Sequence, residues 1–201
     1  MKLALIINDL ETLLPSMATW MLATRAAKRG HEVVFATVGG LTLAPDGMVR
    51  AHVWPVGATD SAGAVVGRKG VTVDLGGFDA VMIRTNPGRD AARAWAHDAM
   101  LVTAGILESR GVVVVNRPSG LRLAATKMYL HHLPAEARPE TLVTGDTEEL
   151  IAFVHSRGAE KSVIKPIIGT RGRGVFVVSA DDLNLRAMIE LLTADGMVMA
   201  Q

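Results

Sequence analysis

The chain opens with a strand, a helix and a second strand, and this order constrains its fold more than any other feature. Residues 3–7 (Leu-Ala-Leu-Ile-Ile) form a continuous apolar run, which is typical of a strand covered on both faces. A helical pattern follows, with Pro15 near its start and Gly30 at its end. Residues 31–37 then form a second apolar strand. Because parallel neighbours need a crossover helix between them, this opening predicts an α/β domain with a parallel, Rossmann-like sheet.

The alternation of short apolar runs and helical periods continues through the first 122 residues. We predict a hairpin, a mobile surface loop, a buried strand, a long helix and a further strand at residues 41–53, 58–70, 79–84, 91–108 and 112–115. Trp95, Met100 and Leu107 are among the expected buried positions of the long helix.

The character of the sequence changes after Pro118, since proline cannot extend the preceding strand. We predict a domain of residues 1–122 and a second, α+β domain of residues 123–201. In the second domain the expected helices are at residues 119–130, 146–155 and 185–192. The expected strands are at residues 162–166, 175–178 and 197–201, and residues 131–139 form a linker.

Composition excludes several classes of protein. The chain has no cysteine, which rules out a disulfide scaffold or a thiolate metal site. Its 21 Lys and Arg residues balance 20 Asp and Glu residues, and only 4% of its residues are aromatic, so it lacks the basic and stacking surfaces of nucleic-acid-binding proteins. No apolar run is long enough to span a bilayer. We therefore predict a soluble, cytoplasmic protein that binds neither nucleic acid nor membrane.

A strand that ends in a lysine, followed by a glycine-rich loop and a returning strand, is the strongest local motif. Lys165 comes near the end of the first strand, and the loop contains Gly169, Gly172 and Gly174. Glycines let backbone N–H groups converge on one point, which suits a phosphate chain. The alternative interpretation is an ordinary solvated hairpin turn. The spacing is that of neither a P-loop nor a dinucleotide-binding fingerprint.

An ordered series of motifs favours the phosphate-binding interpretation. It comprises Val-Asn-Arg-Pro-Ser-Gly at 115–120, Thr-Lys-Met-Tyr at 126–129, Pro-Glu-Thr-Leu-Val-Thr at 139–144, Val-Ile-Lys-Pro at 163–166 and Met-Val-Met-Ala-Gln at 197–201. This series resembles the ATP-grasp ligases, most closely the prokaryotic glutathione synthetases, over essentially the whole chain. One departure is Thr85-Asn86-Pro87-Gly88, where that family typically has Lys-Asp-Pro-Pro, which leaves open a different acid substrate.

The resemblance implies an N-terminal pre-ATP-grasp substrate domain and the first part of an ATP-grasp domain. It implies ATP and Mg²⁺ as cofactors, and small-molecule acid and amine substrates, γ-glutamylcysteine and glycine, joined through an acyl phosphate. The nucleotide-binding positions that match the family are Lys127, Lys165, Gly169, Thr170, Arg171, Gly172, Arg173, Gly174 and Gln201. We predict that Arg84 helps to hold the acid substrate, and we assign no catalytic side chain. We also expect a homo-oligomer.

The 201 residues contain no carboxylate cluster that would bind the metal. The adjacent Asp181 and Asp182 are better explained as a loop that leads into a helix. We therefore expect the Mg²⁺ ligands beyond residue 201. Because the chain ends inside an expected central strand, we expect it to be a fragment of a longer protein. Two alternatives stay open: a nucleotide-binding module without catalysis, and half of a nucleotide-sugar glycosyltransferase.

Overall fold

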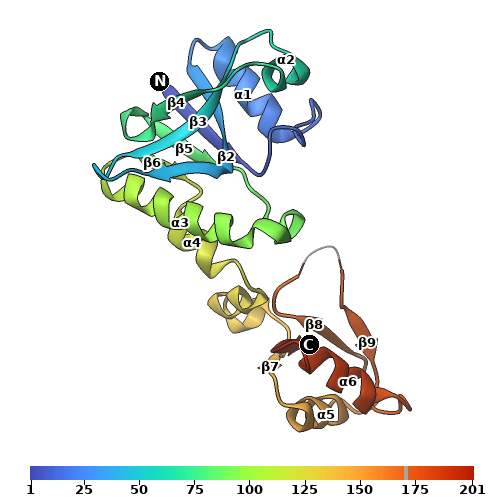
Figure 1. The fold of residues 1–201 in the computed structure, drawn as a ribbon. Coiled ribbons are helices and arrows are strands. Elements are labelled where there is room, and N and C mark those ends of the chain that lie inside the picture. The colour runs from blue at the N-terminus through green and yellow to red at the C-terminus, as the bar shows by residue number, and fades with distance from the viewer. Residues whose placement is uncertain (170–171) are drawn as a thin grey trace. The chain divides into compact units, whose positions relative to one another are not determined.

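The computed structural model of the chain describes residues 1–169 and 172–201. These residues form two compact units, Met1–Arg122 and Leu123–Gln201 (Figure 1). Each unit has its own sheet and its own core, as expected for an α/β unit followed by an α+β unit. None of the described helices is long and apolar enough to cross a membrane.

The N-terminal unit is built on a mostly parallel six-stranded sheet with the order β4-β3-β2-β1-β5-β6. Its strands are β1 (Lys2–Ile7), β2 (Glu32–Leu43), β3 (Val49–Val56), β4 (Val71–Asp74), β5 (Ala80–Ile83) and β6 (Val113–Val115). β1 is parallel to β2 and β5, and β5 is parallel to β6, whereas β3 and β4 are antiparallel to their neighbours. The predicted hairpin is the β2–β3 turn, and β4 is a strand that the sequence analysis missed.

Helices cover both faces of this sheet. The helices of the unit are α1 (Ala18–Lys28), α2 (Ala62–Val66), α3 (Ala94–Ser109) and α4 (Pro118–Leu123), with 3₁₀ turns at Leu75–Gly77, Pro87–Arg89 and Ala91–Arg93. Trp20 of α1 packs with Leu5 and Phe35 on one face. Met100 of α3 packs with Ile6 and Val81 on the other face. The sheet therefore separates two cores, which explains why β1 is apolar at consecutive positions.

Several local predictions for the N-terminal unit are wrong. The stretch at residues 58–70 contains α2, which begins because the Ser61 side chain accepts a hydrogen bond from Ala64 N–H. α1 begins at Ala18, so Pro15 lies before the helix rather than at its start. Trp95 is 67% exposed, because α3 is apolar on more than one side and buries Ala96 and Met100 instead.

The C-terminal unit contains a four-stranded antiparallel sheet with the order β7-β10-β8-β9. Its strands are β7 (Leu142–Thr144), β8 (Ser162–Pro166), β9 (Phe176–Val178) and β10 (Val198–Ala200), and its helices are α5 (Thr147–Ser156) and α6 (Leu185–Thr193). The Asp146 side chain caps α5 by accepting from Glu148 and Glu149 N–H. β7 is a strand that the sequence patterns do not predict.

Residues 119–139, which lie between the strands of the two sheets in the sequence, differ most from their predicted structure. The single helix expected at residues 119–130 ends at Leu123, and the 3₁₀ helix Lys127–His132 follows it. A shorter 3₁₀ turn, Ala135–Ala137, lies within the predicted linker. The break has a tertiary cause, because Lys127 N–H donates to Ile167 O at 2.9 Å instead of continuing the helix.

Both helices of the C-terminal unit pack on the same face of its sheet. Its core contains Ile164 of β8 and Val178 of β9, packed with Leu150, Val154 and Ile189 from the helices. Successive residues of a strand point to opposite faces, so the neighbours of these strand residues lie on the face away from α5 and α6. Val177 is on that face and is 60% exposed.

Candidate functional site

The winding of the N-terminal sheet reverses between β1 and β5. The chain leaves β1 over one face through α1 to reach β2, and it leaves β5 over the other face through α3 to reach β6. In open α/β sheets, ligands bind outside the carboxyl ends of the strands at such a point. Asn8 and Asp9 follow β1 there, and Arg84 follows β5. This edge is the candidate substrate site of the N-terminal unit.

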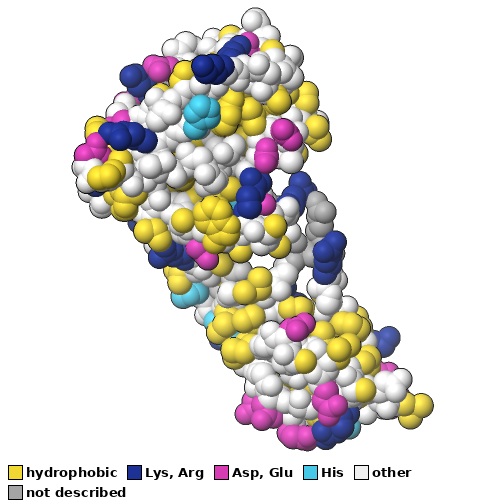
Figure 2. All heavy atoms as spheres, viewed as in Figure 1, with side chains coloured by type: hydrophobic (Ala, Val, Ile, Leu, Met, Phe, Trp, Pro, Cys, Tyr) yellow, Lys and Arg dark blue, Asp and Glu magenta, His cyan; other side chains and the backbone are white. Residues whose placement is uncertain are grey.

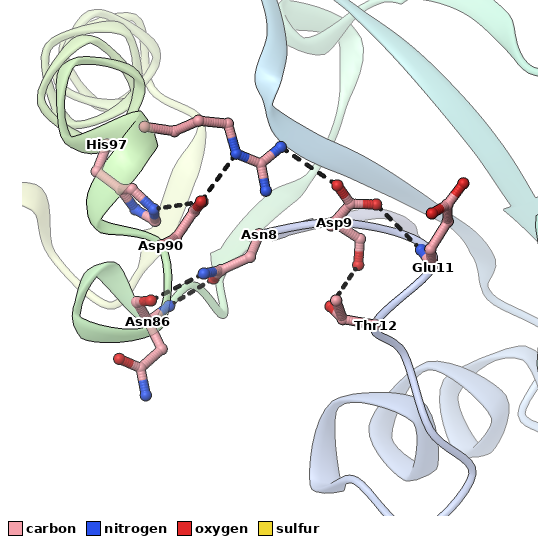
Figure 3. A network of polar contacts seen from close by, with 8 residues as sticks. Asn8, Asp9, Glu11, Thr12, Asn86, Asp90 and His97 are labelled. Atoms are coloured by element: carbon pink, nitrogen blue, oxygen red, sulfur yellow. Dashed lines mark hydrogen bonds and ion pairs between the residues drawn. The ribbon is translucent and has the colours of Figure 1, made fainter. Parts of the chain in front are cut away.

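Asn8 fixes the segment that follows β5. Its side-chain amide donates to Asn86 O at 2.8 Å, and its side-chain oxygen accepts from Asn86 N–H at 2.6 Å (Figure 3). Both bonds involve the main chain of Asn86, so they hold the backbone and leave the Asn86 side chain free of this contact. The two residues are 78 positions apart, and no local pattern in the sequence predicts that they interact.

Asp90 joins the start of α3 to the same edge. It accepts from Arg93 Nε at 2.9 Å, and His97 Nε2 lies 3.0 Å from its other oxygen (Figure 3). Arg93 also donates to Asp9 at 3.3 Å. Burial acts to raise the pKa of Asp90, but the hydrogen bonds from Arg93 and His97 outweigh it and lower the pKa. The carboxylate therefore stays ionised and holds α3 to the end of β1.

His97 is almost completely buried, and its Nδ1 has no hydrogen-bond partner among the described residues. The sequence predicts no role for this histidine, because an isolated histidine in a helical pattern carries no signal of its own. Its partner Asp90 lies only seven residues earlier in the sequence, and Asp90 in turn bonds to Arg93 three residues further on.

Arg84 lies at the predicted strand end and is exposed. Its backbone N–H donates to Ile6 O at 2.8 Å, which continues the β1–β5 pairing, and its Nε donates to Thr19 Oγ1 at 3.3 Å. Thr19 is buried in the first turn of α1. This hydroxyl orients an accessible guanidinium, the group best suited to bind a carboxylate with two parallel hydrogen bonds.

Lys165 lies on the face of the C-terminal sheet that is turned away from α5 and α6. Its neighbour Ile164 is in the core, so Lys165 points the opposite way. Val163 and Val177, which pair across β8 and β9, lie on the same face as Lys165. The half-buried Lys165 is thus a cation beside a small apolar surface.

Lys127 reaches the same strand end from the 3₁₀ helix. Its Nζ donates to Pro166 O at 2.7 Å and to Gly169 O at 3.3 Å. Burial lowers the pKa of Lys127, and the positive charge of Lys165 lowers it further. The structure therefore brings together the two lysines that the sequence analysis singled out, close enough for one charge to act on the other.

Gln201 and Thr141 complete this polar group. Lys165 Nζ donates to Gln201 Oε1, and Gln201 Nε2 donates to Thr141 Oγ1 at 3.0 Å. Gln201 had been predicted as a nucleotide-binding residue, whereas Thr141 had been given no role. A hydroxyl in the Pro-Glu-Thr-Leu-Val-Thr motif was the available signal, but only the sheet order places it beside Gln201.

The glycine-rich segment joins β8 to β9, as predicted. Gly172 and Gly174 have φ angles of 71° and 68°, which side chains with a Cβ rarely adopt. A Cβ at Gly174 would lie 2.9 Å from Pro166 Cγ, so this position also needs glycine for space. Arg173 is exposed, and Gly169 lies beside Lys127. The predicted residues Thr170 and Arg171 lie outside the described residues.

The described residues contain no group of three or more His, Cys, Asp or Glu side chains placed to hold a metal ion. They therefore do not supply the oxygen ligands that Mg²⁺ requires, and no step through the metal is derived from them. An open hollow of about 380 Å³ between α3 and α4 contains none of the predicted site residues. On the face seen in Figure 2, basic side chains are scattered among acidic and apolar ones and form no continuous stripe.

Solved structures with a similar fold define the class of the protein. D-cycloserine synthetase DcsG superposes with a TM-score of 0.58 at 21% identity, over all of this chain and 59% of that one. A RimK domain ATP-grasp protein from Sphaerobacter thermophilus matches with a TM-score of 0.58 at 25% identity, over all of this chain and 63% of that one. The fold is that of the ATP-grasp ligases.

The chain belongs to the prokaryotic glutathione synthetase family. The family model described as prokaryotic glutathione synthetase, N-terminal domain, matches residues 1–122. The family model described as prokaryotic glutathione synthetase, ATP-grasp domain, matches residues 126–201. The glutathione synthetase of Gloeobacter violaceus is 36% identical over 98% of this chain and 60% of its own length. That of a Nostoc species is 30% identical over 98% of this chain and 61% of its own length.

The resemblance seen in the sequence is thus confirmed, and the chain spans about 60% of the length of these relatives. The glycosyltransferase alternative loses its support, because the glycine-rich turn lies between antiparallel strands rather than at a strand-to-helix junction.

Proposed function

We propose that the protein supplies the substrate-binding and first nucleotide-binding elements of an ATP-dependent ligase that joins γ-glutamylcysteine to glycine. Residues 1–122 hold the acid substrate, and residues 123–201 hold ATP. The observation that carries this proposal is the convergence of Lys127, Lys165 and the glycine-rich segment at one end of β8. Family membership supports the same reaction class.

The two lysines suit the charge of a triphosphate. Both Nζ atoms now bond to neutral oxygens, Lys127 to two carbonyls and Lys165 to an amide. A phosphate oxygen is a stronger acceptor for an ammonium group than either, because it is negatively charged and adds an ion pair to the hydrogen bond. Burial makes the Lys127 charge costly in the free protein, and a nearby phosphate removes that cost.

The chemistry needs positioning and charge neutralisation more than a nucleophilic side chain. When bound, ATP supplies the phosphoryl group that activates the substrate carboxylate, and the amine of glycine then displaces phosphate. In this scheme Lys127 and Lys165 neutralise the phosphates, and Arg84 orients the carboxylate. The glycine-rich segment lets backbone N–H groups approach the phosphates and excludes water from the reactive acyl phosphate.

The experiment is a nucleotide titration of the full chain and of its lysine variants. We expect Lys127→Ala and Lys165→Ala each to weaken ATP binding by about 10- to 100-fold, the effect of losing a charged hydrogen bond. Lys161→Ala is the matched control, because Lys161 is an exposed lysine just before β8. Equal affinity in all three variants contradicts the assignment of the phosphate site.

A nucleotide-binding module without catalysis is the second candidate. It would use the same two lysines and glycine-rich segment to bind ATP and differs from the ligase only in turnover. Release of phosphate from ATP that depends on both γ-glutamylcysteine and glycine supports the ligase. ATP binding without such release supports the module.

A further inference from the structure

The side chains of Lys165, Gln201 and Thr141 form a hydrogen-bond chain that ends on a backbone carbonyl. Lys165 Nζ bonds to Gln201 Oε1, Gln201 Nε2 bonds to Thr141 Oγ1 at 3.0 Å, and Thr141 Oγ1 donates to Pro139 O at 2.8 Å. Thr141, Lys165 and Gln201 are all half-buried. These hydrogen bonds join three segments of the C-terminal unit that are far apart in sequence.

The donor and acceptor groups of the three side chains determine the direction of each of these hydrogen bonds. An ammonium group can only donate, so the atom of Gln201 that faces Lys165 must be the amide oxygen. The amide nitrogen then faces Thr141 and donates to it. Thr141 has one proton, which Pro139 O accepts, so its oxygen is left to accept from Gln201. The orientation of the Gln201 amide is therefore determined from both ends.

The main chain of Gln201 is already occupied. Its N–H donates to Val163 O at 3.0 Å, and its C=O accepts from Val163 N–H at 2.8 Å. The side-chain amide is then the group of Gln201 that still offers both a donor and an acceptor to a ligand. That amide keeps one free lone pair on Oε1 and one free N–H on Nε2, in a fixed spatial order.

The order of donor and acceptor on this amide can discriminate between the two purine bases. Adenine presents a donor at its amino group beside an acceptor at its ring nitrogen, whereas guanine presents a carbonyl acceptor beside an N–H donor. Turning the amide of a glutamine over exchanges its own donor and acceptor, and so exchanges the base that it fits. An amide that cannot turn over selects one of the two bases.

We propose that Thr141 is a positioning residue that locks the Gln201 amide and so makes the site select adenine over guanine nucleotides. This rests on the proposed function and on the nucleotide-binding position that the family resemblance implies for Gln201. Once Lys165 turns to the phosphates, its contact with Oε1 is lost, and Thr141 is the group that still holds the amide. Thr141 touches no ligand itself and acts through Gln201.

The experiment compares ATP and GTP binding to the full chain by calorimetry in wild type, Thr141→Ser and Thr141→Val. Valine keeps the shape of threonine but has no hydroxyl, and serine keeps the hydroxyl. We expect wild type and Thr141→Ser to prefer ATP, and Thr141→Val to lose about 3- to 10-fold of that preference, the effect of one neutral hydrogen bond. A purely structural role would weaken both nucleotides equally.

Thr141→Ala provides a second test if the valine variant does not fold. A readout without nucleotide is the pair of Gln201 side-chain NH₂ signals in NMR, which should be protected from exchange in wild type and Thr141→Ser and lose protection in the other variants. An unchanged ATP-to-GTP ratio in Thr141→Val and Thr141→Ala overturns the proposal. So does a wild type that binds both nucleotides equally, although the phosphate site at Lys127 and Lys165 would then still stand.

Discussion

The sheets of the two units differ in how their faces are covered, and this difference decides where polar chemistry is found. The N-terminal sheet has a core on each face, so its functional side chains lie at the ends of β1 and β5. The C-terminal sheet packs α5 and α6 on one face, and Lys165 lies on the other face itself. A sheet with a core on each face offers a ligand only the ends of its strands. On the C-terminal sheet, the half-buried Lys165 offers its ammonium group from the second face, beside the fully buried Met199.

The two candidate sites also differ in how they are held. At the N-terminal edge, side chains from several segments bond to one another, as in the network of Asn8, Asp9, Asp90 and Arg93. At the C-terminal site, the two lysines bond to carbonyl and amide oxygens, which a phosphate can displace. We infer that the first site is shaped before its ligand arrives, and that the second rearranges its contacts when its ligand binds.

The largest expected effect tests the two faces of the C-terminal sheet. Ile164→Ala removes a fully buried side chain and should cost about 3 kcal/mol of unfolding free energy. Val177→Ala, on the exposed face, should cost less than about 0.5 kcal/mol. Urea unfolding followed by circular dichroism measures both values. Similar losses in the two variants would show that the second face is packed as tightly as the first.

A smaller effect is expected at the N-terminal edge. Asn8→Ala removes both hydrogen bonds to the Asn86 backbone and should cost about 1–2 kcal/mol. Asn86→Ala is the matched control, because it leaves the backbone atoms of the clamp in place. Urea unfolding of the N-terminal unit, followed by tryptophan fluorescence, compares the two. If Asn86→Ala is as destabilising as Asn8→Ala, the clamp is not the stabilising element.

The smallest effect concerns the titration of Lys127. Burial and the Lys165 charge both lower its pKa below the ordinary value of 10.5. In Lys165→Gln the second cause disappears, so the pKa of Lys127 should rise but stay below 10.5, since the burial remains. NMR of labelled lysine side chains follows this titration, and Lys161→Gln is the control that should leave it unchanged. A pKa that stays the same or falls in Lys165→Gln would mean that the two ammonium groups do not interact.

The elements with strong local signals were predictable from sequence. β8 was predicted at the residues where it occurs, and the Asp146 cap places the start of α5. Lys127 and Lys165 were found through motifs, and the structure brings them to one strand end. β8 and α5 are predicted correctly because short-range patterns of apolar and capping residues determine them, whereas the nucleotide-binding role of the two lysines comes from the family resemblance and stays a prediction.

The elements that failed depend on contacts between distant residues. The helix expected at residues 119–130 is broken by the bond from Lys127 to Ile167 O, which no periodicity reveals. Trp95 was misplaced because a helix that is apolar on several sides has no unique buried face. Asn8 and Thr141 were not recognised, since each acquires its partner only through the order of strands in a sheet.

The exposed position of Trp95 also bears on how the molecule can be observed. All three indole rings, those of Trp20, Trp54 and Trp95, lie in the N-terminal unit, whereas the sole phenol, Tyr129, lies in the C-terminal unit two residues after Lys127. Indole emission therefore reports on one unit alone, and with a natural contrast between a shielded ring at Trp20 and a water-facing ring at Trp95. The native chain carries separate optical labels for its two units.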